Sequence, residues 1–109
     1  MANNQNTVQQ MAIFTPKKGM VDELLKLAAE GAEHHKHVPT CLKWLFSQEI
    51  NVQDGDEPSF ILVQEWSSVE ELFAHRDSEY AINMRNRILP IVSKFEMKTS
   101  KYVAGFHSK

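Results

Sequence analysis

The chain has 109 residues, of which 42% are hydrophobic and 24% charged, as in a single ordinary globular domain. Its formal net charge of -2 lacks the basic balance that phosphate binding needs, so nucleic acid is not an expected partner. No apolar stretch approaches the roughly 20 residues that cross a bilayer, and the single cysteine, Cys41, favours the cytoplasm over a disulfide-forming compartment.

The N-terminal part of the chain is expected to hold a tail, a strand and a helix. Residues 1–6 are polar and lack the basic and apolar segments of a signal peptide, so we expect a flexible tail before a single domain over residues 7–109. Residues 7–15 predict a first strand, which Pro16 closes. Apolar residues then recur at the spacing of an amphipathic helix, which Pro39 ends. The residues expected to face inward are Val21, Leu24, Leu25, Ala28 and Ala32.

Histidines cluster at the end of this helix, in the stretch EHHKH. His34 and His37 lie three residues apart and could face one way on a helix. The sequence supplies no carboxylate or cysteine set that completes a zinc pattern. We therefore interpret the stretch as a solvated helix end, whose basic side chains suit the negative end of the helix dipole, and we expect no metal.

The middle of the chain predicts a β-hairpin. Residues 41–50, CLKWLFSQEI, form the second strand, and residues 59–66, SFILVQEW, form the third. The linking segment NVQDGDEP is rich in the residues that favour turns. Alternation along the second strand puts Leu42, Trp44 and Phe46 on one face.

A short capped helix follows the hairpin. Ser67 or Ser68 can cap its first turn, and a glutamate three residues further on completes a capping box in either case. The expected buried stripe of this helix consists of Val69, Leu72 and Phe73.

The segment RDS interrupts the helical pattern, and Ser78 can cap a third helix. Pro90 marks a kink or the start of the last turn. The alternating segment FEMKTSKYVAGF, residues 95–106, predicts a fourth strand. The expected inward side of the third helix consists of Tyr80, Ala81, Met84, Arg85 and Ile88.

The order β-α-β-β-α-β, with the second helical region split, predicts an α+β, ferredoxin-like fold with a four-stranded antiparallel sheet. The third strand is apolar on both faces, with Phe60, Leu62 and Trp66 opposed by Ile61 and Val63. Two crossover helices cover one face only. We therefore expect a homodimer in which two sheets pack face to face around a two-fold axis.

Three stretches, FTPKKGMVDELLKLAAEGAEHH, CLKWLFSQE and above all LVQEWSSVEELFAHRDSEY, resemble the antibiotic biosynthesis monooxygenase family of dimeric α+β barrels. The resemblance covers about residues 8–106. It implies a pocket in each protomer, between the helices and the sheet, that suits a small apolar ligand. The family includes cofactor-free oxygenases of polycyclic phenols, quinol oxidases, haem-degrading enzymes, an isomerase of a sugar phosphate and members with no known activity, so the family does not fix the function.

Three residues are the candidates for catalysis in such a pocket. His75 could take a phenolic proton, or it could cap a carbonyl and hold the segment RDS. Trp66 could stack on the substrate and bind an oxygen through its indole N–H, or it could close the end of the barrel. Arg85 could hold an oxyanion or extend to solvent. The candidates for substrate binding are Tyr80, Trp44, Asn83, Phe73 and Met84.

The first functional hypothesis is a cofactor-independent monooxygenase that oxidises a phenol, quinol or anthrone-like aromatic to a quinone with O₂. The sequence has no G-x-G-x-x-G and no P-loop, so no nucleotide, flavin or nicotinamide cofactor is expected, and the substrate must supply the electrons. Two alternatives remain open: an isomerase of a small hydroxy-carbonyl compound, and a non-catalytic dimeric ligand-binding or stress-associated module.

Overall fold

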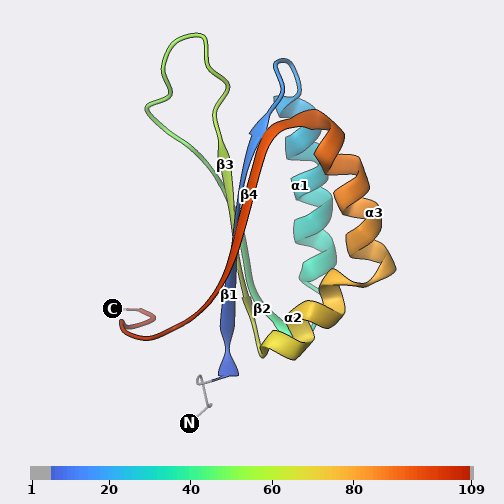
Figure 1. Cartoon of the computed structure of the whole chain (residues 1–109), viewed down its shortest axis with the longest axis vertical. Helices are drawn as coiled ribbons and strands as arrows, with labels where there is room; N and C mark the ends of the chain where they lie inside the picture. Colours follow the sequence, from blue (N-terminus) through green and yellow to red (C-terminus); the bar gives the residue numbers. More distant parts are fainter. Residues whose placement is uncertain (1–5, 109) are drawn as a thin grey trace.

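The computed structural model describes residues 6–108 of the chain, so the tail predicted at residues 1–6 lies, apart from Asn6, outside the described residues. The described part contains one sheet and a layer of helices (Figure 1). The elements in chain order are β1 (Val8–Pro16), α1 (Val21–His35), β2 (Cys41–Gln48), β3 (Phe60–Trp66), α2 (Val69–Arg76), α3 (Glu79–Ile88), the 3₁₀ turn η2 (Leu89–Ile91) and β4 (Val92–Lys101).

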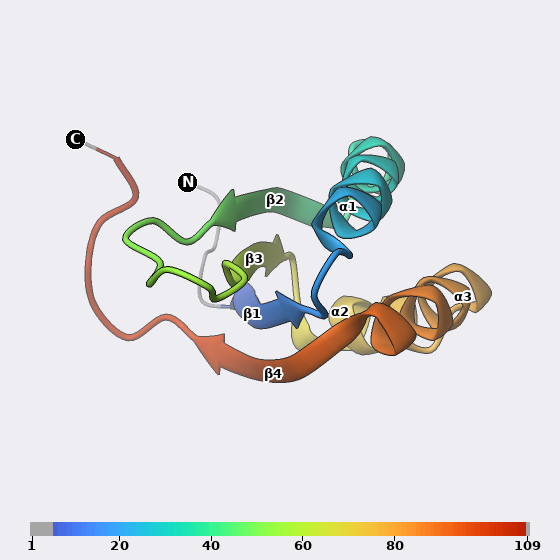
Figure 2. The same cartoon turned by 90° about the horizontal axis from the view of Figure 1, so that it is seen from above.

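The strands form one four-stranded sheet in the order β2-β3-β1-β4, and every neighbouring pair is antiparallel. The three α-helices all lie on the same side of this sheet (Figures 1 and 2). The predicted α+β, ferredoxin-like fold is therefore confirmed. Among residues 6–108, no helix combines the length and the apolar character needed to span a bilayer.

Strand alternation builds the core between the sheet and the helices. Ala12 and Phe14 of β1 and Phe60 and Leu62 of β3 are buried on the helix side, where Leu24 of α1 packs against them. A second buried cluster lies at the other end of the sheet. It consists of Val8, Trp66 and Leu72.

The inward face of α1 differs from the prediction. Leu25 is 41% exposed and Ala32 is also exposed. The buried residues, three or four positions apart, share one helical face: Leu24, Leu27, Gly31 and His35. The prediction passed over Gly31 and His35 because neither residue is a hydrophobic anchor.

The strand and helix ends follow local hydrogen bonding. Ser68 accepts a hydrogen bond from the Glu71 amide and Ser78 accepts one from the Ala81 amide, so both expected caps form. The fourth strand was predicted at residues 95–106, but β4 ends at Lys101. Lys101 pairs with Val8, the first residue of β1, so the sheet offers β4 no further partner.

The face of the sheet away from the helices is apolar in its middle. Pairing places Met11 and Ile13 of β1 beside Val63 and Ile61 of β3, with Leu45 of β2 opposite Val63. No helix covers this face in the described part of the chain (Figure 2), and Leu45 is 60% exposed. The two apolar faces predicted for the third strand are thus present.

Candidate functional site

A cavity of about 180 Å³ lies between the helix layer and the sheet. Most of its wall is apolar and is supplied by β1, α1, β2, β3, α3 and β4. Several lining residues on α2, α3, η2 and β4 are exposed, so the cavity opens to solvent on that side. These mouth residues are Arg76, Arg85, Leu89, Phe95 and Met97.

Two histidines from different helices meet at the wall of this cavity. His35 Nδ1 lies 2.7 Å from the Gly31 carbonyl oxygen, and its Nε2 lies 3.0 Å from Nε2 of His75. A carbonyl oxygen only accepts hydrogen bonds, so His35 carries its proton on Nδ1 and its Nε2 is an acceptor. The proton between the rings therefore belongs to His75 Nε2. In the neutral pair, His75 Nδ1 is left unprotonated, and no residue in the described part of the chain bonds to it.

Tryptophan rings hold both imidazoles in place. Trp66 lies against His75, with ring centroids 4.8 Å apart, and Trp44 stacks on His35 at 5.4 Å. Trp44 can approach α1 this closely because Gly31 has no side chain: a Cβ there would lie 2.9 Å from Trp44 Cζ2. The segment interpreted as a solvated helix end thus contributes a buried histidine, His35, whereas Glu33, Lys36 and His37 are exposed as expected.

Burial keeps both histidines neutral. It lowers the pKa of His75 to about 4, with a smaller contribution from the neighbouring His35 and His34. Burial also lowers the pKa of His35, partly offset by the bond to the Gly31 carbonyl. The two rings are therefore neutral at physiological pH, and the tautomers derived above are the ones present.

Within residues 6–108, two buried side-chain polar atoms have no hydrogen-bond partner: Trp44 Nε1 and Tyr80 Oη. Both residues line the cavity. His34 stacks flat on the Tyr80 ring at a centroid distance of 3.5 Å, which fixes that ring. Burial raises the pKa of Tyr80, so its hydroxyl keeps its proton and can donate. The lining residues thus include two that carry an unpaired donor, one indole N–H and one phenolic O–H, each almost fully buried among its neighbours.

Trp66, expected to bind an oxygen through its N–H, is committed elsewhere. It is fully buried, and its Nε1–H donates to Gln64 Oε1 at 2.9 Å. Gln64 Nε2 in turn donates to Gln10 Oε1 at 3.2 Å. Both glutamines line the cavity and Trp66 does not. Trp44, whose Nε1 has no partner within residues 6–108, lines the cavity instead, and Trp66 packs against the His75 ring.

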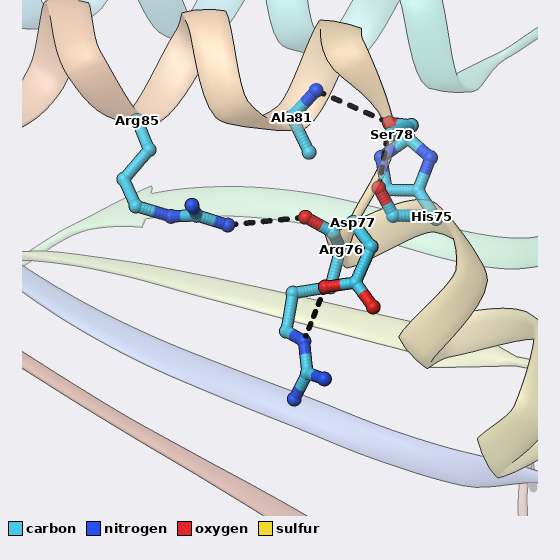
Figure 3. A network of polar contacts seen from close by, with 6 residues as sticks. All are labelled: His75, Arg76, Asp77, Ser78, Ala81 and Arg85. Carbon is cyan, nitrogen blue, oxygen red and sulfur yellow. Dashed lines mark hydrogen bonds and ion pairs between the residues drawn. The ribbon is translucent and has the colours of Figure 1, made fainter.

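Arg85 lines the cavity at its mouth and is exposed. Its guanidinium donates to the Arg76 carbonyl oxygen at 3.1 Å, which joins α3 to the end of α2 (Figure 3). In residues 6–108, no carboxylate forms an ion pair with Arg85, whereas Arg76 pairs with Asp77 at 3.2 Å. Ser78 completes the junction by donating to the His75 carbonyl at 2.6 Å.

The remaining candidates divide into two groups. Met84 lines the cavity, as expected. Asn83 and Phe73 are exposed and are not part of the lining, because they face outward from α3 and α2. The polar lining residues that sequence reasoning missed are Gln10, His35, Gln64 and Arg76. For His35, the spacing of residues 24, 27, 31 and 35 on one helical face was the available signal.

No group of three or more His, Cys, Asp or Glu side chains within residues 6–108 is arranged to hold a metal ion. The three neighbouring histidines instead bond or stack with one another and with Tyr80. Chemically, the arrangement offers a neutral base, two hydrogen-bond donors and an apolar wall.

The fold and the site define a ferredoxin-like α+β domain with an apolar cavity beneath its helix layer. A family model described as antibiotic biosynthesis monooxygenase matches residues 7–87, and the chain belongs to this family.

Solved structures support the fold. Rv0793 from Mycobacterium tuberculosis is 17% identical, with a TM-score of 0.79 over 91% of this chain and 97% of that one. A protein from Deinococcus radiodurans, described as a candidate antibiotic biosynthesis monooxygenase, is 12% identical, with a TM-score of 0.81 over 94% and 98% of the two chains. The comparison with curated proteins found no match.

Acid should destabilise the protein through His75. The ordinary pKa of 6.5 falls to about 4 in the folded chain, so between these values the unfolded chain binds the proton and the folded chain does not. Above pH 6.5, His75 is neutral in both the folded and the unfolded chain, so it does not make the free energy of unfolding depend on pH. As the pH falls through the range, the free energy of unfolding should drop by on the order of 1–3 kcal/mol.

Urea unfolding of the wild type and of His75→Gln, at about pH 7.5 and about pH 5, measures this effect. We expect the wild type to lose more stability between the two conditions than the variant loses. Equal losses in the two proteins would contradict the assignment of a buried, neutral His75.

Proposed function

We propose that the protein is a cofactor-independent monooxygenase that oxidises a phenol, quinol or anthrone-like ring to a quinone. The observation that carries the proposal is His75, whose ring lines an apolar cavity and whose bond to His35 leaves Nδ1 unprotonated. Membership of the family over residues 7–87 supports oxygen chemistry of this kind. The single cysteine supports a place in the cytoplasm.

In the proposed reaction, His75 Nδ1 accepts the proton of a ring hydroxyl. The Nε2–H of the resulting imidazolium still donates its hydrogen bond to His35 Nε2. The Nδ1–H of His35 still donates to the Gly31 carbonyl oxygen. His35 therefore acts through His75 and is a positioning residue. Because its bond exists before and after proton transfer, the ring need not turn during the reaction.

The low proton affinity of His75 sets a condition on the substrate. Moving a proton from an ordinary phenol of pKa ~10 to a ring whose pKa is about 4 costs roughly 8 kcal/mol. Donors that hold the oxyanion reduce this cost, and Trp44 Nε1–H and Tyr80 Oη–H are suited to that role. Conjugation of the ring hydroxyl with a ring carbonyl lowers the pKa of the hydroxyl and so reduces the cost of proton transfer further. The proposed substrate is therefore an acidic phenol rather than a simple one.

The electron-rich oxyanion then supplies the electrons that O₂ needs, without an added cofactor. For a phenol, one oxygen atom becomes the second quinone carbonyl, and the other leaves as water with the hydrogens of the hydroxyl and the ring C–H. The ring loses four electrons and O₂ gains four. For a quinol, two electrons and two protons pass to O₂, which leaves as hydrogen peroxide.

The size and polarity of the cavity favour a compact aromatic ligand. An engineered apolar cavity of roughly 150 Å³ binds benzene, so a cavity of about 180 Å³ suits one or two rings. A small hydroxy-carbonyl compound, the substrate of the isomerase alternative, would place hydroxyl groups against Leu24, Leu62 and Met84. Those hydroxyl groups would lose hydrogen bonds with water and gain none. Ring oxidation is therefore favoured over isomerisation.

We further propose that two copies pack their uncovered sheet faces together. Met11, Ile13, Ile61 and Val63 lie next to one another on this face, and Leu45 extends the patch across β2. Burying apolar surface of this kind stabilises by roughly 25 cal/mol per Å². The helix side of each copy, with its cavity, then remains free for ligand.

Oxygen uptake tests the proposed reaction. Metal-free protein supplied with a reduced naphthoquinol or a hydroxylated naphthalenone should consume O₂ above the rate of spontaneous oxidation. His75→Ala should lower kcat by roughly 100-fold or more, because it removes the base. His37→Ala is the matched control, because the His37 side chain is exposed, pairs with Glu33 and does not line the cavity.

Turnover that is unchanged in His75→Ala would overturn the role of His75. Exchange of substrate protons with D₂O without O₂ uptake would instead favour the isomerase, and binding with neither outcome would favour a non-catalytic ligand-binding module.

Sedimentation equilibrium tests the dimer. The wild type should sediment as a dimer, and Leu45→Lys should weaken association at least roughly tenfold, because it places a charge within the apolar interface. Ile82→Lys is the control, since Ile82 is 42% exposed on α3, on the opposite side of the molecule. A wild type that remains monomeric at high concentration would contradict the arrangement.

A further inference from the structure

Arg85 occupies an unusual position for an arginine without an acidic partner. It lines an apolar cavity, and its guanidinium is held by the Arg76 carbonyl at 3.1 Å rather than extending freely into solvent (Figure 3). That bond uses one Nη2–H. The other N–H groups of the Arg85 guanidinium have no partner within residues 6–108.

The neighbouring arginines differ from Arg85. Arg87, two residues further along α3, makes two bonds of 2.9 Å to the carboxylate of Glu30. Arg76 bonds Asp77 at 3.2 Å and lies over the Phe73 ring at 4.4 Å. The described part of the chain thus neutralises the other two cations of this region and leaves the charge of Arg85 unpaired beside the cavity.

The cavity therefore has two chemically different ends. Among the less exposed lining residues, Trp44 Nε1 and Tyr80 Oη are buried donors without a partner within residues 6–108, and they suit a neutral or partly charged oxygen better than a permanent anion. At the exposed end, Arg85 offers a full positive charge in contact with water. A permanent anion loses little hydration at such a mouth, whereas burying it at the inner end would be costly.

We propose that the ligand is a hydroxylated aromatic acid of one or two rings, with its hydroxyl at the buried donors and its carboxylate on Arg85. The inference rests on the proposed function, since it names the substrate class of the same cavity. The planar guanidinium can donate two parallel hydrogen bonds to a carboxylate. Arginine therefore recognises a carboxylate by geometry as well as by charge. The apolar wall of the cavity suits the aromatic ring of such a ligand.

A matched pair of ligands tests the carboxylate site. The acid 6-hydroxy-2-naphthoate and its neutral methyl ester share the ring and the hydroxyl, and differ at the far end in charge and by one methyl group. Isothermal titration should give a Kd for the acid at least roughly tenfold lower than that of the ester. Added NaCl should reduce the difference in Kd between the acid and the ester, because the contact between Arg85 and the carboxylate is exposed to solvent.

Two variants with the same change in charge complete the test. Arg85→Gln should abolish the difference between acid and ester, whereas Arg87→Gln should preserve it, because Arg87 lies outside the cavity lining. Equal affinities in the wild type, or a difference that survives Arg85→Gln, would overturn the proposal.

The outcomes also separate this inference from the proposed reaction. If the acid binds as expected but neither the naphthoquinol nor the hydroxylated naphthalenone drives O₂ uptake, the monooxygenase proposal fails and the carboxylate site stands. If neither ligand binds, both fail.

Discussion

Two hydrogen-bond donors, on the cavity-lining residues Trp44 and Tyr80, are buried without an acceptor in the part of the chain that the structure describes. Folded proteins pair nearly all such groups, because each one left unpaired costs about 1–3 kcal/mol. The surrounding structure maintains this arrangement: Gly31 lets Trp44 pack against α1, and His34 stacks on Tyr80. A ligand oxygen that accepts from these donors would recover the lost interactions, and the proposed function assigns them that role.

The ends of three helices converge on the same region. The last turn of α1 supplies His35, the end of α2 supplies His75, and the first turn of α3 supplies Tyr80. The cap at Ser78 links α2 to α3 and bonds the carbonyl of His75 itself. Structural and functional roles therefore coincide at this junction, and the same bonds that end one helix and begin the next also orient the proposed base.

Much of the fold could be predicted from the sequence. The alternation of β3, the serine caps and the inward stripe of α3 are local patterns, and the structure confirms each of them. The site was harder to predict. Trp44 and Trp66 both lie on strands, and only pairing and burial show that Trp66 donates to Gln64 whereas Trp44 faces the cavity unpaired. The role of His35 depends on a contact with a ring 40 positions away, which no local pattern shows.

The central claim is that the unpaired donors beneath the helices receive a ligand oxygen, and the two tryptophans provide an internal comparison. The most direct measurement is a ¹H–¹⁵N spectrum of the indole N–H groups during titration with 6-hydroxy-2-naphthoate. We expect the Trp44 signal to shift and its exchange with solvent to slow, whereas the Trp66 signal, bonded to Gln64, stays nearly unchanged. A Trp44 signal that does not move at saturating ligand would contradict the account.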